Sequence, residues 1–538
     1  MFLSDDFVTV EEIPVSRWPE GDPDAEPLRL ACEWDRARFA KHFLPHWCPD
    51  AFNKVHLDYY QLFADRQGSR GHRDVVAAPR GSSKTTGCAL LGIIHDCCYH
   101  HEDFIVYITN RYDNARDKVR QIRDELESNQ EIVRVFGPQV GATWNQDDFI
   151  CTNGVRVLAA GRNTQVRGIT NKQAQRPTKV VLDDCESSEH VLQAEQREKD
   201  LNWLVSDILR LGAPHSNFEL SGTILHQDSL LAKTMKNPAW TPRFYQAVIR
   251  YADAESIPLW QQWRDLYLDL SNPCRQRDSL AFFEAHQEAM LAGSVVLWPE
   301  RQNYRQLMEI RLADGESAYQ CELMNDPTGD VRRLFHMDEA GYCTVMPEGI
   351  LRADGKYIPF LEIQEWVGFL DPTPPKNEVL GSDWAACPIV VKDRDGYVYC
   401  IDCFMAQEAQ PSKVIEGVVN LLWRWKVPLL GIESNGFASL LVQDIREAIY
   451  QRAQAEGVAW DVTLLPIVHM KNKMLRIKTL EPMVHNQWLQ FSRDLHPEAL
   501  REMAVFIPLD GADFDDFPDA LEGACRVVRG LYDKRSPF

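Results

Sequence analysis

Short apolar runs alternate with amphipathic stretches along the first half of the chain. Residues 85–99 and 112–129 have helical periodicity, and the apolar runs between such stretches have the length of strands, which is typical of an α/β domain. The predicted strands are 74–78, 104–109, 155–159, 179–182, 218–222 and 244–250. The pattern then changes, and residues 254–330 are predicted to be mainly helical and are rich in aromatic side chains.

A second α/β pattern follows a break at 325–329, where Asn, Asp, Pro and Gly gather. Its predicted elements are a strand at 366–370, a hairpin of 389–392 and 397–402, a helix at 412–425 and a strand at 429–433. A chain of 538 residues is too long for one ordinary core. We therefore predict an α/β fold with a first domain at 1–330, a linker at 331–364 and a second domain at 365–538.

The composition is that of a globular protein, with 45% hydrophobic and 25% charged residues. The apolar runs are too short to span a membrane, and the acidic start does not have the features of a signal peptide. The 14 cysteines are scattered and contain one CxxC pair, Cys400 and Cys403, without a second pair for zinc. Reduced thiols in a cytoplasmic protein are the simpler interpretation. The net charge of −21 means that any DNA-binding surface must be local.

Residues 78–85 read APRGSSKT, between an apolar strand and an apolar helix. A phosphate-binding loop wraps phosphates with backbone N–H groups, contacts them with a lysine and holds Mg²⁺ with a hydroxyl. Ala78 and Ser83 replace the two usual glycines. The predicted nucleotide-binding residues are Arg80, Gly81, Ser82, Ser83, Lys84, Thr85 and Asp183.

The apolar strand that begins at Lys179 ends in Asp183 and Asp184. Asp183 is predicted to hold Mg²⁺ through water, together with Thr85. Asp184 and Glu186 compete for the role of the carboxylate that polarises the attacking water. The sequence Ser-Gly-Thr at 221–223 ends the next predicted strand, where a residue that senses the γ-phosphate often lies.

Arg167 lies in a polar, glycine-containing loop at 161–170. An arginine on such a loop can stabilise the charge of phosphoryl transfer, in its own subunit or in a neighbour. A solvated loop cation is the alternative. Arg80 is a second cation, within the phosphate loop itself.

Acidic residues recur at the ends of predicted elements in the second α/β part. Asp371 follows one strand, Glu433 ends another, and Asp516 and Asp519 lie one turn apart at the start of the last helix. Two-metal cleavage of phosphodiesters needs several converging carboxylates. Asp371, Glu433 and an acid of the last helix, Asp516 or Asp519, satisfy this need. Each acid taken alone can also be a turn former, a surface acid or a helix cap.

A basic group, Lys471, Lys473 and Arg476, precedes a helical segment in the same part of the chain. It is a candidate contact for the DNA backbone, and a solvated helix face is the alternative.

In this order the motifs resemble those of the large terminase subunits of tailed double-stranded DNA bacteriophages, over nearly the whole chain. The matching segments are APRGSSKT, VRG at 166–168, VVLDDCE, SGT at 221–223, LWPE at 297–300, AYQCELMNDP at 318–327, FLDP, GIESNGF and DDFPDAL. The resemblance implies an ASCE-type P-loop ATPase domain followed by an RNase H-like nuclease domain. By position it matches Asp371, Glu433 and Asp516 to the nuclease metal ligands, with Asp519 as a near competitor. It matches Arg167 to the arginine finger of the family, for which Arg80 is the alternative. Many members have Asp-Glu where this chain has Asp183-Asp184, so the ATPase base stays open between Asp184 and Glu186.

The resemblance also implies how such a protein works. It implies a motor that uses ATP and Mg²⁺ to drive double-stranded DNA into a procapsid, and a nuclease that uses two Mg²⁺ or Mn²⁺ ions to cut concatemeric DNA. The implied partners are DNA, the portal protein, the small terminase subunit and further copies of the chain in a ring. Whether the free protein is a monomer stays open. The implied location is the cytoplasm of the infected bacterium and, transiently, the portal vertex, with no membrane.

Two other classes of protein fit parts of the pattern. A DNA helicase with a fused nuclease would need a second RecA-like domain, and no second P-loop-like unit follows residue 253. A non-catalytic assembly protein would not need the intact Lys84, Thr85 and Asp183.

Overall fold

The structure is a computed structural model that describes residues 25–162, 164, 168–171, 174–327, 333–372, 384–407, 410–433, 438–469, 472–508 and 515–531. These residues form two compact units. The first consists of the described parts of Met1–Ile249, Val295–Tyr304 and Cys321–Pro327, and the second of those of Arg250–Ser294, Arg305–Gln320 and Thr328–Phe538. Among the described residues, no helix combines the length and apolar character needed to cross a membrane.

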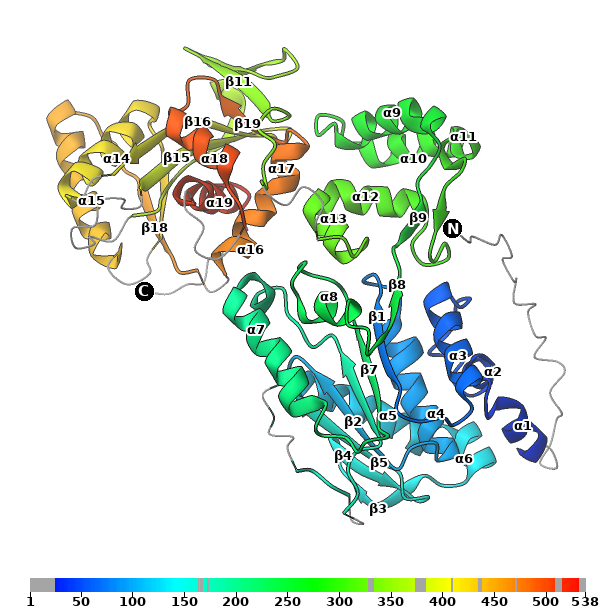
Figure 1. The fold of residues 1–538 in the computed structure, drawn as a ribbon. Coiled ribbons are helices and arrows are strands. Elements are labelled where there is room, and N and C mark those ends of the chain that lie inside the picture. The colour runs from blue at the N-terminus through cyan, green and yellow to red at the C-terminus, as the bar shows by residue number, and fades with distance from the viewer. Residues whose placement is uncertain are drawn as a thin grey trace. The chain divides into compact units, whose positions relative to one another are not determined.

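The first unit is built on an eight-stranded sheet (Figure 1). In spatial order its strands are β3 (Val140–Trp144), β4 (Asp148–Cys151), β5 (Arg156–Gly161), β2 (Phe104–Thr109), β6 (Lys179–Asp183), β7 (Asn217–Gly222), β1 (Arg73–Ala77) and β8 (Thr241–Phe244). The strands from β5 to β8 are parallel, and β3 and β4 are antiparallel additions. Strand β7 lies between the phosphate-loop strand β1 and the acid-ending strand β6, which is the ASCE arrangement.

The central strands of this sheet are buried on both sides, and their apolar side chains point into two separate cores. On β2, Ile105 and Tyr107 join one core cluster, while Phe104, Val106 and Ile108 join another. The first cluster includes residues of α1, α2, α4, α5 and α6, and the second includes residues of η5 and α8. The helices of this unit are α1 (Ala25–Cys32), α2 (Arg36–Phe43), α3 (Lys54–Arg66), η3 (Lys84–Leu90), α4 (Leu91–Tyr99), α5 (Tyr112–Ser128), α6 (Gln130–Phe136), η4 (His190–Leu192), α7 (Ala194–Trp203), η5 (Leu204–Ile208) and α8 (Leu230–Met235).

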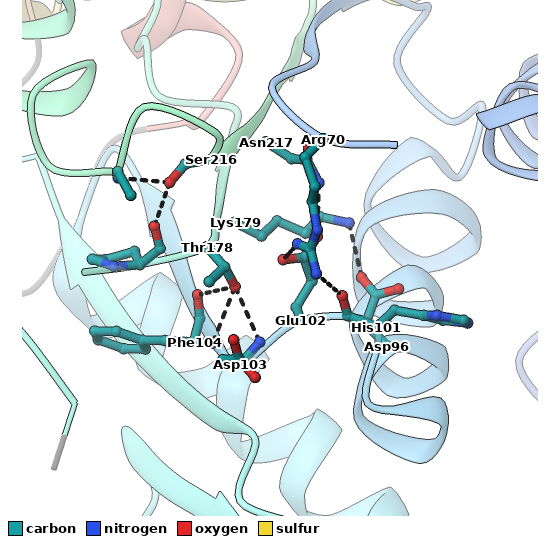
Figure 2. Close-up of polar contacts among 12 residues, drawn as sticks. Arg70, Asp96, His101, Glu102, Asp103, Phe104, Thr178, Lys179, Ser216 and Asn217 are labelled. Atoms are coloured by element: carbon teal, nitrogen blue, oxygen red, sulfur yellow. Dashed lines mark hydrogen bonds and ion pairs between the residues drawn. The ribbon is translucent and has the colours of Figure 1, made fainter. Parts of the chain in front are cut away.

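Charged side chains of β6, β7, α2 and α4 pair with one another near the amino end of β6. The buried Lys179 contacts Asp96 at 3.0 Å and Glu219 at 2.7 Å, Asp96 also binds Arg36, and Glu219 accepts a hydrogen bond from Tyr59. We call these five residues the paired network. Figure 2 shows Lys179 beside Asp96, together with neighbouring contacts such as that between Glu102 and Asn217 (2.8 Å).

Most of the predicted elements of the first unit are present within a few residues of their expected limits. The predicted strand 244–250 is wrong as a single element, since β8 ends at Phe244 and β9 (Val248–Arg250) pairs with β10 (Val295–Val296). Between them, the N–H of Tyr245 bonds to Ala77 and that of Ala247 to Leu323, which diverts the chain. The antiparallel pair β3 and β4 was not expected.

The second unit begins with the mainly helical segment that the sequence predicts. Its helices are η6 (Ala254–Ser256), α9 (Ile257–Leu268), α10 (Arg275–Ala285), α11 (Gln287–Leu291), α12 (Tyr304–Asp314) and α13 (Glu316–Glu322), of which the last two lie partly in the first unit. Trp263, Phe283 and Met290 form a small core within it.

A nine-stranded sheet forms the centre of the second unit. In spatial order its strands are β13 (Tyr357–Pro359), β12 (Gly349–Leu351), β11 (Gly341–Met346), β19 (Leu489–Ser492), β16 (Val398–Ala406), β15 (Ala385–Asp393), β14 (Ile363–Leu370), β17 (Leu429–Glu433) and β18 (Thr463–Ile467). Strands β14, β15 and β16 form an antiparallel meander, and β17 and β18 run parallel to β14. This order, with two parallel strands added to the first strand of a meander, is RNase H-like and confirms the predicted fold class.

Helices cover the sheet of the second unit on both faces. They are η7 (Phe360–Glu362), α14 (Pro411–Trp425), α15 (Ala438–Glu456), α16 (Lys473–Ile477), η8 (Lys478–Leu480), α17 (Glu481–His485), α18 (Pro497–Val505) and α19 (Asp516–Val528). Residues of α14 and α15 pack in one core with β14 to β17, and α19 lies against β14 and β15. The strands β11, β12, β13 and β18 were not expected from the sequence.

Candidate nucleotide and metal sites

The phosphate loop has a backbone that two residues hold in the left-handed region. Gly81 has φ +82°, and a Cβ there would lie 3.3 Å from the side chain of Gln302, so glycine suits both the conformation and the space. Ser83 has φ +61° at the position of the second usual glycine. The loop is tied down at Ser82, whose carbonyl accepts a hydrogen bond from the Asn53 amide at 3.0 Å. The helix that follows starts with η3, which has π-type hydrogen bonding, and continues as α4.

Lys84 lies at the carboxyl edge of the sheet with its side chain almost fully buried. Its Nζ donates to the Thr223 hydroxyl at 3.2 Å and lies 3.5 Å from an oxygen of Asp184. The Ser-Gly-Thr segment and the phosphate loop are therefore adjacent, as parallel neighbouring strands β1 and β7 require.

The three acids after β6 have different surroundings. Asp183 is buried and its two oxygens accept hydrogen bonds from Tyr107 and Ser221, each at 2.8 Å. Asp184 has φ +46° and a half-exposed carboxylate. Glu186 accepts the N–H groups of Leu230 (2.6 Å) and Leu231 (3.0 Å), so it caps the first turn of α8. Of Asp184 and Glu186, Asp184 is the one that faces Lys84.

A cavity of about 390 Å³ lies between these groups at the carboxyl edge. It brings together most of the predicted nucleotide-site residues, namely Arg80, Lys84, Thr85, Asp183, Asp184 and Glu186, with Asn110, Asn114 and Lys118 on its wall. Arg80 is largely exposed and lies 3.3 Å from Glu322. Arg167 lies outside the described residues, so its placement stays a prediction.

Three acids from distant segments meet on one face of the sheet in the second unit. Side chains alternate along a strand, so Asp371 lies on the same face as Phe369, and Glu433 on the same face as Gly431. Phe369 and Gly431 are paired across β14 and β17. A Cβ on Gly523 of α19 would lie 2.4 Å from the Phe369 ring, so the helix approaches the sheet as closely as a glycine allows. Asp519 is one turn before Gly523, and this packing brings it to the strand ends.

Oxygens of Asp371, Glu433 and Asp519 lie within 4.8 Å of one another. We call these residues the acid cluster. Asp519 is buried and lies 2.7 Å from Arg476 and 3.4 Å from Lys473. Such a set of converging carboxylate oxygens suits hard divalent cations such as Mg²⁺ or Mn²⁺.

Asp516 is outside this group, although the sequence favours it over Asp519 as the third ligand. Its carboxylate accepts the N–H of Trp384 at 2.6 Å. The next residue, Phe517, donates its N–H to the fully buried Glu502 at 2.7 Å. Lys473 also contacts Asp515 at 3.1 Å, so the described part of the predicted basic group, Lys473 and Arg476, faces acids. Lys471 lies outside the described residues.

Like charges raise the pKa values in the acid cluster. Burial and the neighbouring Glu433 and Asp519 raise the pKa of Asp371 well above its usual value. The pKa of Glu433 is raised by burial and by Asp519, and the effect of Arg476 and Lys473 is smaller and opposite. A cation between these carboxylates would relieve the repulsion.

Comparison with solved structures finds terminases. The fold is similar to that of the large terminase from the thermophilic bacteriophage D6E, with 9% identity over 90% of this chain and 100% of that chain, at a TM-score of 0.47. The same protein in complex with ADP gives 10% identity and a TM-score of 0.45. The human cytomegalovirus terminase nuclease domain gives 13% identity over 32% of this chain and 84% of that chain, at a TM-score of 0.24. No protein-family model and no curated protein sequence matches the chain.

Proposed function

We propose that this chain is a phage large terminase subunit, an ATP-driven DNA translocase with a metal-dependent nuclease. The observation that carries the proposal is the convergence of distant motif residues at two separate sites. One is the cavity around Lys84, Asp183 and Asp184, and the other is the acid cluster. Both lie where strands of an α/β sheet end, which is where such sheets bind ligands.

The first site is suited to hydrolyse ATP. The backbone N–H groups of Gly81 and Ser83 and the Lys84 ammonium bind the phosphates, and Thr85 and Asp183 hold the Mg²⁺ that neutralises phosphate charge. Asp184 is the better candidate for the base that orients the attacking water, because Glu186 is engaged by α8. An arginine, Arg167 from a neighbouring subunit or Arg80 from the same one, stabilises the transferred charge.

The second site is suited to cut DNA. Asp371, Glu433 and Asp519 would hold divalent ions, with Asp519 in place of Asp516 because it is the acid that the fold brings to the other two. When bound, such ions supply an activated water and stabilise the leaving oxygen. Arg476 holds the Asp519 carboxylate in place, and Lys473, a third exposed, contacts Asp515 and Asp519.

The working assembly follows from the resemblance of the motifs. We propose that the protein binds double-stranded DNA, the portal protein and the small terminase subunit, and works as a ring of copies at the portal vertex in the cytoplasm of an infected bacterium. The domain limits 1–330, 331–364 and 365–538 stay part of this proposal.

Paired activity assays on the full chain test the proposal. The wild type should hydrolyse ATP faster with DNA present and should cut plasmid DNA only with Mg²⁺ or Mn²⁺. Lys84→Ala should lose hydrolysis and keep cutting, while Asp371→Asn should do the reverse. Strand unwinding by the wild type would favour a helicase instead, and a wild type inactive in both assays would favour an assembly protein.

A further inference from the structure

The buried carboxylate of Asp183 is held from both sides by neutral hydroxyl groups. Tyr107 on β2 donates to one oxygen and Ser221 on β7 to the other, both at 2.8 Å. These strands flank β6, which ends in Asp183. Both Tyr107 and Asp183 are almost completely buried.

The position of Tyr107 in the sheet explains its reach. It pairs with Val181, two residues before Asp183, on the neighbouring strand. Tyr107 belongs to the core on that face of the sheet, and it is also one of the residues that line the cavity of the nucleotide site. A phenylalanine would fill the same space in the core, so only the hydrogen bond to Asp183 requires the hydroxyl.

Neutral donors have a different effect from a salt bridge. A lysine or arginine would neutralise Asp183 and weaken its attraction for a cation, whereas two hydroxyls fix the orientation of the carboxylate and leave its negative charge. Donors of this kind behind a metal-binding carboxylate orient it and tune its affinity.

We propose that Tyr107 is a positioning residue that orients Asp183 toward the hydrated magnesium of Mg·ATP. This inference rests on the proposed ATPase function. The Tyr107 hydroxyl acts through Asp183.

The test is the Mg²⁺ dependence of ATP hydrolysis by the full chain. Tyr107→Phe should lower kcat or raise the Mg²⁺ concentration for half-maximal rate by about 10-fold, with nucleotide affinity in the absence of Mg²⁺ unchanged. A matched control is Tyr399→Phe, which removes a buried hydrogen bond from Tyr399 to Asp393 (2.6 Å) in the second unit. The control should leave the Mg²⁺ dependence as in the wild type.

A second measurement asks whether Tyr107 acts through Asp183. Mg²⁺ should strengthen ADP binding to the wild type, less so to Tyr107→Phe, and not at all to Asp183→Asn. Adding Tyr107→Phe to Asp183→Asn should then change nothing further, because the group that Tyr107 orients is already lost. A further loss in the double variant would overturn the proposed route.

The outcomes separate this inference from the function on which it rests. A wild type that neither binds nor hydrolyses ATP would refute the ATPase proposal itself. An active wild type with an unchanged kcat and Mg²⁺ dependence in Tyr107→Phe would overturn the role of Tyr107 alone. If Tyr107→Phe does not fold, Ser221→Ala probes the same carboxylate from β7, and an unchanged Mg²⁺ dependence there would equally overturn the inference.

Discussion

The paired network of the first unit and the acid cluster of the second are built from the same kinds of side chain in opposite arrangements. In the network, the carboxylates of Asp96 and Glu219 share Lys179, and Arg36 adds a second cation at Asp96. In the cluster, three carboxylates face one another, and the cations Lys473 and Arg476 contact Asp519.

The pKa shifts of the two groups have opposite directions for this reason. Lys179 and Arg36 hold the pKa of Asp96 well below its usual value despite burial. Burial, Glu433 and Asp519 raise the pKa of Asp371. Breaking a buried ion pair is costly, because it leaves one charge without its partner. Carboxylates that face one another repel, and such groups with shifted pKa values are found most often at sites that bind or react. We therefore propose a structural role for the network and a metal-binding role for the cluster.

The largest expected effect is the loss of stability when the paired network loses Lys179. Lys179→Met would leave Glu219 without its cation and Asp96 with Arg36 alone, in a buried environment. Removing one partner of a buried ion pair typically costs about 3–5 kcal/mol. Denaturant unfolding of the first unit should show a loss of this size at neutral pH.

A surface lysine provides the control for that variant. Lys54 pairs with Asp58 at 3.1 Å on α3, and its side chain is 64% exposed. Lys54→Ala should change the free energy of unfolding by less than about 1 kcal/mol. Equal losses of unfolding free energy in the two variants would show that the contribution of the network to stability does not depend on its burial.

The next largest effect concerns metal binding at the acid cluster. A ligand that binds only the folded state stabilises it by about 2.7 kcal/mol at 100 times its Kd. Mn²⁺ should raise the melting temperature of the wild type, and Asp371→Asn should lose both this shift and DNA cutting. Without metal the variant should be at least as stable as the wild type, because a like charge is gone. Thermal melting with and without Mn²⁺ measures both.

An acid of the same unit that lies outside the cluster is the control for Asp371→Asn. Asp395 forms an ion pair with Lys356 at 2.7 Å, and Asp395→Asn should keep the full metal shift and the cutting activity. A metal shift of the same size in Asp371→Asn would remove Asp371 from the metal site.

The third prediction concerns pH. Because the pKa of Asp371 and that of Glu433 are raised in the folded state, these two carboxyl groups bind more protons in the folded protein than in the unfolded chain above about pH 4. In chelator, the second unit should therefore lose stability as pH rises from about 4 toward the raised values, by about 1.4 kcal/mol per unit of pKa shift. Asp371→Asn should flatten this slope, and saturating Mn²⁺ should suppress it. The measurement is the free energy of unfolding of both proteins from acidic to neutral pH. An equally steep slope in Asp371→Asn would contradict a raised pKa of Asp371 as its cause.

Part of the acid cluster could be predicted from the sequence. Asp371 and Glu433 follow apolar runs, and the end of such a run is visible in the sequence. The last helix was predicted with Asp516 and Asp519 on one face, but which of them reaches the strands depends on the contact between Phe369 and Gly523, which are far apart in the chain. The glycine four residues after Asp519 was the available signal.

Contacts between residues far apart in the chain could not be predicted from local sequence patterns. Asp96 and Lys179 are 83 residues apart, and neither apolar periodicity nor a motif links them. The hydrogen bond from Tyr107 to Asp183 has no sequence signal either, since a tyrosine in a buried strand is expected for packing alone. The placement of β7 between β1 and β6 followed only from the resemblance of the motifs.

The smallest expected effect is that of charge pairing at the surface of the first unit. Glu131 on α6 pairs with Arg134 and lies 2.8 Å from His42 on α2, and its side chain is one third exposed. These partners, with Arg134 contributing most, lower the pKa of Glu131 to about 2. Its stabilising effect is therefore present above about pH 4 and is lost as pH falls toward 2. Solvent screens these charges, so Glu131→Gln should cost less than about 1 kcal/mol at neutral pH. The loss should shrink further in about 1 M salt, where the Debye length is about 3 Å, whereas the loss in Lys179→Met should stay nearly constant. Unfolding of both variants at low and high salt makes the comparison, and equal salt sensitivity would mean that water reaches the paired network.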